Sequence, residues 1–292
     1  MSQKISIRFY NDREVRAVWS EDTQKWYYSV LDVIGAFNQQ DDYAKNRNYW
    51  KYLKAKLKKE DSEVVSATTQ LKMTTPDGKR RLTDVMDMDT VRLLALSFPN
   101  TKAMAFIDWL TNSDNSIDGQ SRKKAYALYE SNLLDSIEVG TVKGLQQIHG
   151  YLFDGLYGFA GQIRRKTIWK DGTIFCRAEY LPYNLSVIER MPETTFDEIV
   201  DKYVEMNVCH PFMEGNGRST RIWLDLIFKR SLKKCVDWSK VDKKQYLNAM
   251  RASTTDATRI KKLLTGALTD DINSREMFMK GIDYSYYYEQ EN

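Results

Sequence analysis

Apolar and polar residues alternate over the first thirty positions of the chain. Residues 5–9 alternate, Asn11 and Asp12 supply a turn, and the alternation returns at residues 15–19 and 26–30. A period of two is that of a half-buried β-strand. We expect short strands here, followed by helix, so that the first third of the chain is a small α+β module.

The segment Tyr43–Lys59 follows a helical period instead. Trp50, Leu53 and Leu57 recur at spacings of three and four residues, which places them on one face of a helix. A helix with this apolar stripe packs against a core and exposes its other residues.

Basic residues gather in two places in this module. The segment 43–59 contains seven Lys or Arg residues and no acid, and residues 75–81 place a Lys-Arg-Arg run after a Pro-Asp-Gly turn. Such clusters are typical of phosphate contacts and equally of a solvated surface, and both interpretations stay open. The net charge of +4 is too small to decide between them. A nucleic-acid contact would use Lys51, Lys54, Lys58 and Arg80.

A polar, turn-rich stretch separates the module from the rest of the chain. We take residues 112–122 as a linker between domains at residues 1–111 and 123–292. Beyond the linker the pattern is mostly helical, with no repeat or low-complexity tract. The residues that recur at helix-like intervals are Leu133, Ile137, Leu145, Ile148, Leu152 and Leu156.

No segment has the character of a leader peptide or a membrane span, and we expect a cytoplasmic protein with no membrane partner. Cysteines are odd in number, and their spacings match neither a disulfide framework nor a zinc site. We therefore expect Cys176, Cys209 and Cys235 to be buried, reduced thiols, and we favour core packing over a nucleophilic role for Cys209.

Residues 209–221 carry the most informative chemistry. A Gly-Asn-Gly turn that opens a helix lets backbone approach a ligand closely and aims unpaired N–H groups at it, which makes an anion site. Two arginines on adjoining turns of that helix add a fork geometry suited to phosphate, and a polyphosphate ligand is expected. The binding residues would be Gly215, Asn216, Gly217, Arg218 and Arg221.

A carboxylate and a histidine precede this anion site. Glu214 would oppose phosphate unless a cation intervened, and Mg²⁺ commonly joins one or two carboxylates to substrate phosphates. His210 can take a proton from an incoming hydroxyl, so these residue types together indicate a transferase. The other histidine, His149, lies in an apolar helical pattern and is interpreted as structural.

Residues 210–221 resemble the signature of the Fic (filamentation induced by cAMP) family, His-Pro-Phe-x-(Asp/Glu)-Gly-Asn-Gly-Arg-x-x-Arg, at every fixed place. The resemblance covers roughly residues 125–292. It implies a mainly α-helical Fic fold with a β-hairpin flap. It also implies a protein adenylyltransferase that moves AMP from ATP, with Mg²⁺, to a Ser, Thr or Tyr hydroxyl. In that family His210 would be the base, and Phe212 would anchor its loop in the core.

Two further segments gain an expectation from this resemblance. Residues 168–175 have an Asp-Gly hairpin signal at the place of the flap, whose edge could hold a target protein by strand addition. The flap residues would be Ile168, Lys170, Gly172 and Ile174.

The stretch from Ser285 to Glu289 resembles the inhibitory motif (Ser/Thr)-x-x-x-Glu-(Gly/Asn), with Gln290 departing at the last place. The implied inhibition pairs Glu289 with Arg221, so that ATP binds only unproductively. The alternative is a frayed aromatic tail, and self-modification of a tyrosine at 286–288 is a further hypothesis.

The first module has a looser resemblance. Its Val15-Arg16-x-Val18 and residues 26–33 look like the N-terminal domain of BRO and phage antirepressor-like proteins, which are associated with DNA binding. Two rivals to AMP transfer therefore stand. One is a Fic transferase of another group, such as UMP, phosphocholine or phosphate, and the other is a DNA-binding regulator with a sensory Fic domain.

Overall fold

The computed structural model describes residues 3–75, 78–98, 101–170 and 173–290. The chain divides into two compact units, Met1–Ser116 and Ile117–Glu291. No helix in the described ranges combines the length and the apolar character that crossing a membrane requires.

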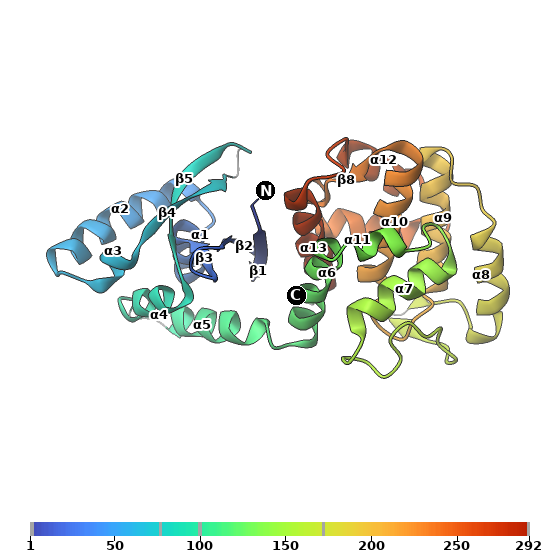
Figure 1. Cartoon of the computed structure of the whole chain (residues 1–292), viewed down its shortest axis with the longest axis horizontal. Helices are drawn as coiled ribbons and strands as arrows, with labels where there is room; N and C mark the ends of the chain where they lie inside the picture. The colour runs from blue at the N-terminus through green and yellow to red at the C-terminus, as the bar shows by residue number, and fades with distance from the viewer. Residues whose placement is uncertain (1–2, 76–77, 99–100, 171–172, 291–292) are drawn as a thin grey trace. The chain divides into compact units, whose positions relative to one another are not determined.

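An antiparallel sheet forms the centre of the first unit, with strands in the order β1-β2-β3-β5-β4 across its described part (Figure 1). Asn11 and Asp12 have positive φ angles of 48° and 61°, the conformation that a tight hairpin turn requires. The predicted turn is therefore confirmed. The strands are β1 (Ile5–Tyr10), β2 (Arg13–Ser20), β3 (Lys25–Ser29), β4 (Thr69–Thr74) and β5 (Arg80–Met86).

Helices cover this sheet, and α1 packs directly on β2, β3 and β5. The amphipathic helix α2 has the predicted bounds, because Asp42 accepts hydrogen bonds from the Ala44 and Lys45 N–H groups and caps its first turn. Its apolar stripe at Trp50, Leu53 and Leu57 is buried as expected. The helices are α1 (Val30–Asn38), α2 (Tyr43–Lys59), α3 (Glu63–Ala67), α4 (Met88–Leu96) and α5 (Thr101–Ser113).

The second unit is mostly helical, as predicted, and its described part also contains two short two-stranded sheets. Its α-helices are α6 (Ile117–Glu130), α7 (Val142–Phe153), α8 (Leu181–Glu189), α9 (Phe196–Cys209), α10 (Asn216–Leu232), α11 (Lys243–Ala252), α12 (Thr258–Ala267) and α13 (Arg275–Glu289). In one of these sheets the hairpin strands β6 (Trp169–Lys170) and β7 (Thr173–Ile174) pair, and in the other β8 (Cys235–Val236) pairs with β9 (Leu268–Thr269), which follows α12. Single 3₁₀ turns are η1 (Leu133–Ser136), η2 (Ala178–Tyr180) and η3 (Trp238–Lys240).

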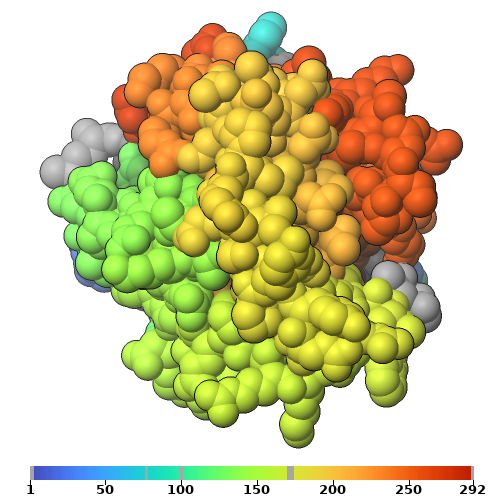
Figure 2. Space-filling view, turned by 90° about the vertical axis from the view of Figure 1, so that its right-hand side faces the viewer, coloured from blue at the N-terminus to red at the C-terminus, as the bar shows by residue number. Residues whose placement is uncertain are grey.

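Helix α10 is the centre of this unit. It packs against α7, α9 and α13, and its Trp223, Leu224 and Ile227 side chains are fully buried. Helix α8 packs on α9 at the periphery, and the yellow part of the chain that includes it crosses the face shown in Figure 2. A residue at the N-terminus of α10 is therefore held by the core from several sides.

The structure corrects the linker predicted at residues 112–122. Only residues 114–116 lie between α5 and α6, and the rest of that stretch is helical. The small residues Gly119 and Ser121 are buried and let α6 approach its neighbours α7 and α13. Close packing accounts for these two small residues, while most of the polar residues around them lie on the exposed side of the helices.

A second correction concerns the apolar pattern between residues 133 and 156. It is not one helical run, since α7 begins only at Val142, after Gly140 with φ of 81° and the capping residue Thr141. Leu133 is partly exposed, on a single 3₁₀ turn. The left-handed glycine and the cap override the helical spacing.

The cysteines are mostly as expected. Cys209 and Cys235 are buried, and Cys176 is half-buried. Burial raises the pKa of the Cys209 thiol to about 12, so its thiolate is scarce at neutral pH and the core-packing interpretation is supported.

Candidate active site

The candidate site is a tight loop that joins α9 to α10. Helix α9 ends at His210, which has a left-handed backbone with φ of 46°, and α10 starts after Gly215, with φ of 80°. Two left-handed residues reverse the chain within this short distance. The loop thereby places the histidine and the start of α10 side by side.

The side chain of Asn216 closes this loop. Its Oδ1 accepts from the Phe212 N–H and its Nδ2 donates to the Phe212 carbonyl, both at 2.8 Å. Phe212 is fully buried and stacks on His149, with ring centroids 3.8 Å apart. Since the amide of Asn216 is occupied, a phosphate contact from this residue would come from its backbone N–H.

His149 has the structural position that its sequence context predicted. Its Nδ1 accepts from the Gly161 N–H at 2.8 Å, so Nε2 carries the proton and donates to the Glu214 carbonyl at 2.9 Å. Burial lowers the pKa of this imidazole to about 4. The neutral ring of His149 therefore bridges Gly161 and Glu214 and supports the loop.

His210 is half-buried and stacks on Phe175, with ring centroids 3.8 Å apart and an angle of 13° between planes. Its Nδ1–H donates to the Asn207 carbonyl at 3.0 Å, which leaves Nε2 unprotonated. Burial lowers the pKa of His210 to about 4. At neutral pH the ring is therefore a neutral base with a fixed tautomer.

The N-terminus of α10 is open toward a ligand. Its N-cap residue, Gly215, has no side chain to cap the first N–H groups, which have no partner within a helix. A Cβ at Gly215 would collide with the Phe153 ring, and a Cβ at Gly217 would collide with Glu289. Gly215 is thus required by its positive φ and by close packing, whereas at Gly217 a Cβ would displace the carboxylate of Glu289, and the uncapped dipole end favours an anion.

Arg218 lies between two carboxylates and two rings. One amino group pairs with Asp118 of α6 and the other with Glu214 Oε1 at 2.9 Å. The rings of Phe153 and Tyr286 face its guanidinium at 5.0 and 5.5 Å. Burial opposes its charge, but Asp118 and the other acidic groups around it together raise the pKa of Arg218. Its buried Nε–H has no acceptor among the described residues, which leaves a donor for an incoming oxygen.

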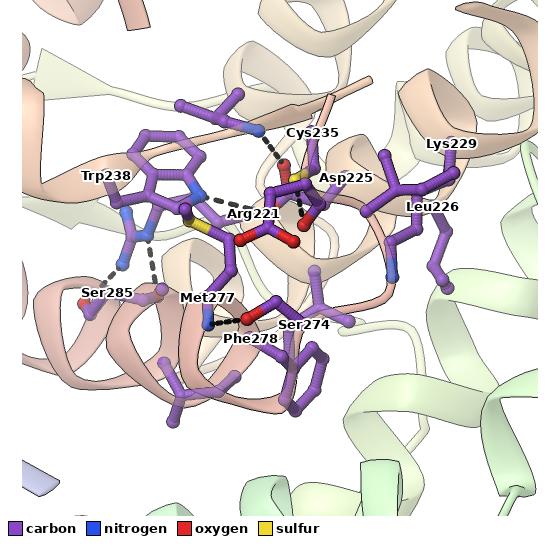
Figure 3. Close-up of a pocket in the computed structure, with 16 residues that line it drawn as sticks. Arg221, Asp225, Leu226, Lys229, Cys235, Trp238, Ser274, Met277, Phe278 and Ser285 are labelled. Carbon is purple, nitrogen blue, oxygen red and sulfur yellow. Dashed lines mark hydrogen bonds between the residues drawn. The ribbon is translucent and has the colours of Figure 1, made fainter. Parts of the chain in front are cut away.

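Arg221 is fully engaged by α13. Its Nε–H donates to Ser285 Oγ at 2.7 Å, and its Nη2 donates to the Ser285 carbonyl and to Glu289 Oε1, at 2.8 and 2.5 Å. In Figure 3, dashed lines join Arg221 to Ser285. The cavity between α10 and α13, about 30 Å³, has room for about two water molecules at most, so α13 is closely packed on this arginine.

Residues 140–228 match the family model described as the Fic/DOC family. The chain contains a Fic/DOC domain. The matched residues run from the glycine before α7 to the middle of α10, and so include the whole loop, His210 and both arginines.

Curated relatives of the Fic/DOC domain are named as protein adenylyltransferases. The chain is 29% identical over 123 residues to a probable protein adenylyltransferase Fic of Salmonella typhimurium, a match covering 36% of this chain and 62% of that protein. It is 24% identical over 169 residues to the probable protein adenylyltransferase Fic of Escherichia coli, covering 52% of this chain and 84% of that protein. The first of these matches thus leaves more than a third of the relative unmatched.

Among solved structures, the chain is similar to the BepC protein of Bartonella tribocorum, a VirB-translocated effector whose crystal structure contains bound AMPPNP. The TM-score is 0.46 at 16% identity, and the match covers 53% of this chain and 87% of that chain.

The tail of the Fic/DOC domain is a helix and not a frayed end. Residues Ser285 and Glu289 lie one turn apart on α13 and both reach Arg221. The phenol of Tyr286 donates to Ser121 Oγ at 2.9 Å, and that of Tyr288 donates to the Trp238 and Val241 carbonyls. In this state two of the three tyrosines are buried, which argues against the hypothesis of their self-modification.

A metal site can be tested on the donor set around Glu214. Among the described residues there is no group of three or more His, Cys, Asp and Glu side chains that could hold a metal by itself. The Glu214 carboxylate is half exposed, with one oxygen on Arg218. Mg²⁺ bound by one carboxylate and by nucleotide phosphates needs no such group. Glu214 therefore fits Mg²⁺ that arrives with a nucleotide.

The predicted flap is a two-stranded hairpin beside His210. Trp169 pairs with Ile174 across it, and both side chains are largely exposed. The next residue, Phe175, stacks on His210. Ile168 is half-buried, Lys170 ends β6, and Gly172 lies outside the described residues.

The predicted nucleic-acid contacts differ in availability. Lys51 and Lys58 are exposed on α2, and Arg80 is exposed at the start of β5, where it donates to Gln3 at 2.7 Å. Lys54 instead pairs with Asp84 at 2.7 Å, so this cation is partly neutralised. It is a weaker candidate than the sequence indicated.

Two residues of the site were missed by the sequence argument. Asp118 pairs with Arg218 from 100 residues away, inside the stretch that was taken as a linker. Arg164 donates to backbone carbonyls at the end of α9. The only sequence signal for Arg164 is its position shortly before the predicted flap.

Proposed function

We propose that the Fic/DOC domain transfers AMP from ATP to a hydroxyl of a Ser, Thr or Tyr on a target protein. One observation carries this proposal. A neutral histidine with a free Nε2 stands beside an uncapped helix N-terminus that bears two buried arginines. A base next to an anion site suits attack by a hydroxyl on a phosphate, and the names of the relatives favour AMP as the group transferred.

The proposed step balances without another reactant. His210 Nε2 accepts the proton of the acceptor hydroxyl, whose oxygen forms a bond to the α-phosphorus. The bond from that phosphorus to the bridging oxygen breaks, and pyrophosphate leaves with the electron pair. The α10 N–H groups and Arg218 face the charge that develops, and such prearranged donors usually supply the largest share of the rate.

Glu214 is the residue that would hold Mg²⁺. The ion, when bound, neutralises charge on the phosphates. Because one oxygen of Glu214 accepts from Arg218, the carboxylate also fixes that arginine at the phosphate site.

We further propose that α13 inhibits the transfer. Arg221 is the second buried arginine of the anion site, and Glu289 neutralises it in this state. Burial opposes the charge of Arg221, while Tyr246 and Glu289 raise its pKa, so the pair stays ionised. If the terminal phosphate of ATP needs Arg221, the carboxylate of Glu289 would repel it. ATP would then be kept out of a productive position.

The test uses ATP labelled on the α-phosphate, with Mg²⁺ and a lysate as the source of acceptor. We expect label on protein with the wild type, more label with Glu289→Gly, and none with Glu289→Gly combined with His210→Ala. His149→Gln is not a suitable control because it holds the loop, so Cys209→Ala, beside the base, serves instead and keeps its label. Label that persists without His210 would contradict the assigned base.

The donor is tested separately. If neither wild type nor Glu289→Gly labels protein, the same variants are given UTP, CDP-choline and γ-labelled ATP. Transfer from one of these would replace AMP by another group on the same site. If no donor gives transfer, the hypothesis of a DNA-binding regulator with a sensory Fic domain becomes the better one.

A second candidate function belongs to the first unit, where α2 presents cations without acids. Its exposed face includes Lys51, Lys58 and the ring of Tyr52, which is 71% exposed. Exposed cations beside an aromatic ring suit contact with nucleic acid. We propose that this face binds DNA.

Salt dependence tests this second candidate. Replacing Lys51 and Lys58 by Glu should weaken duplex binding and make the slope of log K against log salt less steep by about two. Replacing the exposed Lys244 and Lys262 of the other unit by Glu makes the same change of charge elsewhere and serves as the control. Equal effects of both double variants would indicate only nonspecific attraction.

A further inference from the structure

Arg164 is a buried cation that follows α7 and precedes the flap, and its guanidinium is surrounded by backbone carbonyls. Arg164 is 4% exposed. The acceptors are the carbonyl oxygens of His210 at 2.7 Å, Lys166 at 2.6 Å, Cys209 at 3.0 Å and Cys176.

None of these four acceptors is a carboxylate. A buried charge held by neutral dipoles is expensive, and burial accordingly lowers the pKa of Arg164. An apolar side chain of similar volume would avoid this cost if only packing were needed. The position of Arg164 therefore calls for an explanation beyond stability.

The acceptors belong to two separate parts of the site. Cys209 and His210 end α9, where the last carbonyls of a helix lack partners, while Lys166 and Cys176 lie on the two sides of the flap. The backbone adds two bonds between the same parts, from the Arg164 N–H to Pro211 and from the Cys176 N–H to Val208. Arg164 is thus the joint between the base and the flap.

This joint acts on a strained residue. The left-handed backbone of His210 is unfavourable for a residue with a side chain and persists only where its surroundings hold it. Its carbonyl is held by Arg164, and its ring by Phe175, the neighbour of Cys176 in the flap. These two restraints pass through the group of bonds that Arg164 makes, while the third, the bond from the Nδ1–H of His210 to the Asn207 carbonyl, lies within the end of α9.

We infer that Arg164 is a positioning residue, which holds the imidazole of His210 in register with the flap and thereby with the acceptor hydroxyl. The inference rests on the proposed transfer reaction. Arg164 touches neither nucleotide nor acceptor in this assignment. It acts through the backbone that carries the base.

The inference predicts different effects on two measurable quantities, the Kd for ATP and the rate constant for transfer. The anion site at the start of α10 receives no side-chain bond from Arg164, so the Kd for ATP should not change in Arg164→Ala or Arg164→Lys. The rate constant for transfer should fall by about 10²-fold in Arg164→Ala, the size of effect expected from a small displacement of a reacting group. Guanidinium ion at millimolar concentration should restore part of the rate to Arg164→Ala and not to a variant that lacks His210.

A second readout does not depend on activity. The chain has two histidines, and the structure gives them opposite tautomers, Nδ1–H for His210 and Nε2–H for His149. Long-range ¹H–¹⁵N spectra of protein labelled with ¹⁵N-histidine therefore resolve both rings. In Arg164→Ala, His210 should lose its single tautomer and titrate closer to 6.5 than to 4, while His149 keeps its tautomer.

Lys202→Met is the matched control. Lys202 is also a buried cation that donates to carbonyls, those of Glu189 and Met191, and it also pairs with Glu193, away from the loop. This variant should lose stability and keep both the rate constant and the spectrum of His210.

Two results would overturn the inference. One is a normal rate and a normal His210 spectrum in Arg164→Ala. The other is a loss that Lys202→Met shares and guanidinium does not reverse, which would make Arg164 a purely structural residue. If the Glu289→Gly protein transfers no AMP at all, the proposed function fails, but the spectra still decide whether Arg164 fixes the ring.

Discussion

The two histidines show how residue chemistry depends on hydrogen-bond partners. His149 is buried and His210 is half-buried, both rings are neutral, and both stack on a phenylalanine. His149 uses its two nitrogens to join Gly161 to Glu214, whereas His210 uses only Nδ1. Both nitrogens of His149 are used in structural hydrogen bonds, whereas Nε2 of His210 is left to accept a proton from a substrate.

The pH dependence of transfer follows from this difference. A base must be unprotonated, and because the pKa of His210 is lowered to about 4, lowering the pH from 8 through 6.5 should leave the rate constant unchanged. The rate should fall only as the pH approaches about 4. Single-turnover transfer by Glu289→Gly at saturating ATP measures this, and an inflection near 6.5 would show that His210 is solvated in the working enzyme.

A glycine substitution tests the loop. Gly215→Ala must adopt a positive φ and meet the Phe153 ring, so it should lower the free energy of unfolding by about 1–3 kcal/mol and abolish nucleotide binding. Gly266→Ala places the same methyl group in open space on α12 and should stabilise the protein by about 0.4–1 kcal/mol. Urea denaturation compares them, and equal midpoints would refute the packing argument.

Residue roles could be predicted only where the sequence carries a local pattern. The residues from His210 to Arg221 are contiguous, so their chemistry could be predicted from the sequence. Asp118 is a lone carboxylate 100 residues from Arg218, and the partners of Arg164 are backbone carbonyls that every residue possesses. Neither relation leaves a trace in composition or spacing.

At the scale of elements, α13 presents one face to the site. Its residues Ser285 and Glu289 contact Arg221, and Tyr288 on the same helix is anchored through its phenol to η3. The ring of Tyr288 also stacks on Tyr246, with centroids 5.0 Å apart. The inhibitory contact therefore depends on how firmly the helix is docked.

Weakening that docking should raise activity without touching Glu289. Tyr288→Phe leaves the buried Trp238 and Val241 carbonyls without this donor, at a cost of about 1–3 kcal/mol, so transfer should increase over wild type and stay below that of Glu289→Gly. Tyr287→Phe keeps the ring that faces Lys243 and is the control. Initial rates with labelled ATP decide, and no difference between the two would uncouple docking from inhibition.

Elements were predictable where a local signal agreed with packing. The apolar stripe and the Asp42 cap gave α2 its bounds, and the Asn-Asp turn gave the first hairpin. Periodicity failed between residues 133 and 156 because it does not register a left-handed glycine at 140. Composition failed at 112–122, where most of the polar, turn-rich residues lie within helices α5 and α6.

At the scale of the whole chain, the division into two units falls at residue 116, inside the predicted linker. Helix α6 belongs to the second unit and supplies Asp118 to Arg218 and Ser121 to Tyr286. The second unit therefore extends upstream of the residues that match the family model.

Truncation tests this boundary. A fragment of residues 114–292 should unfold cooperatively in urea, because it retains α6 and its contacts with α7 and α13. A fragment of residues 123–292 loses Asp118 and Ser121 and should unfold at lower urea. Circular dichroism follows both, and identical midpoints would mean that the first turns of α6 contribute nothing to this unit.

The distance along the chain between Arg221 and Glu289 has a consequence for biosynthesis. Glu289 follows by 68 residues, so at about 5–20 residues per second it leaves the ribosome about 3–14 seconds later. Until then the guanidinium has no carboxylate to neutralise it, and burying it alone would cost several kcal/mol. The core around α10 is expected to close only when α13 arrives, so the proposed inhibition would apply to a newly made molecule from the moment it is folded.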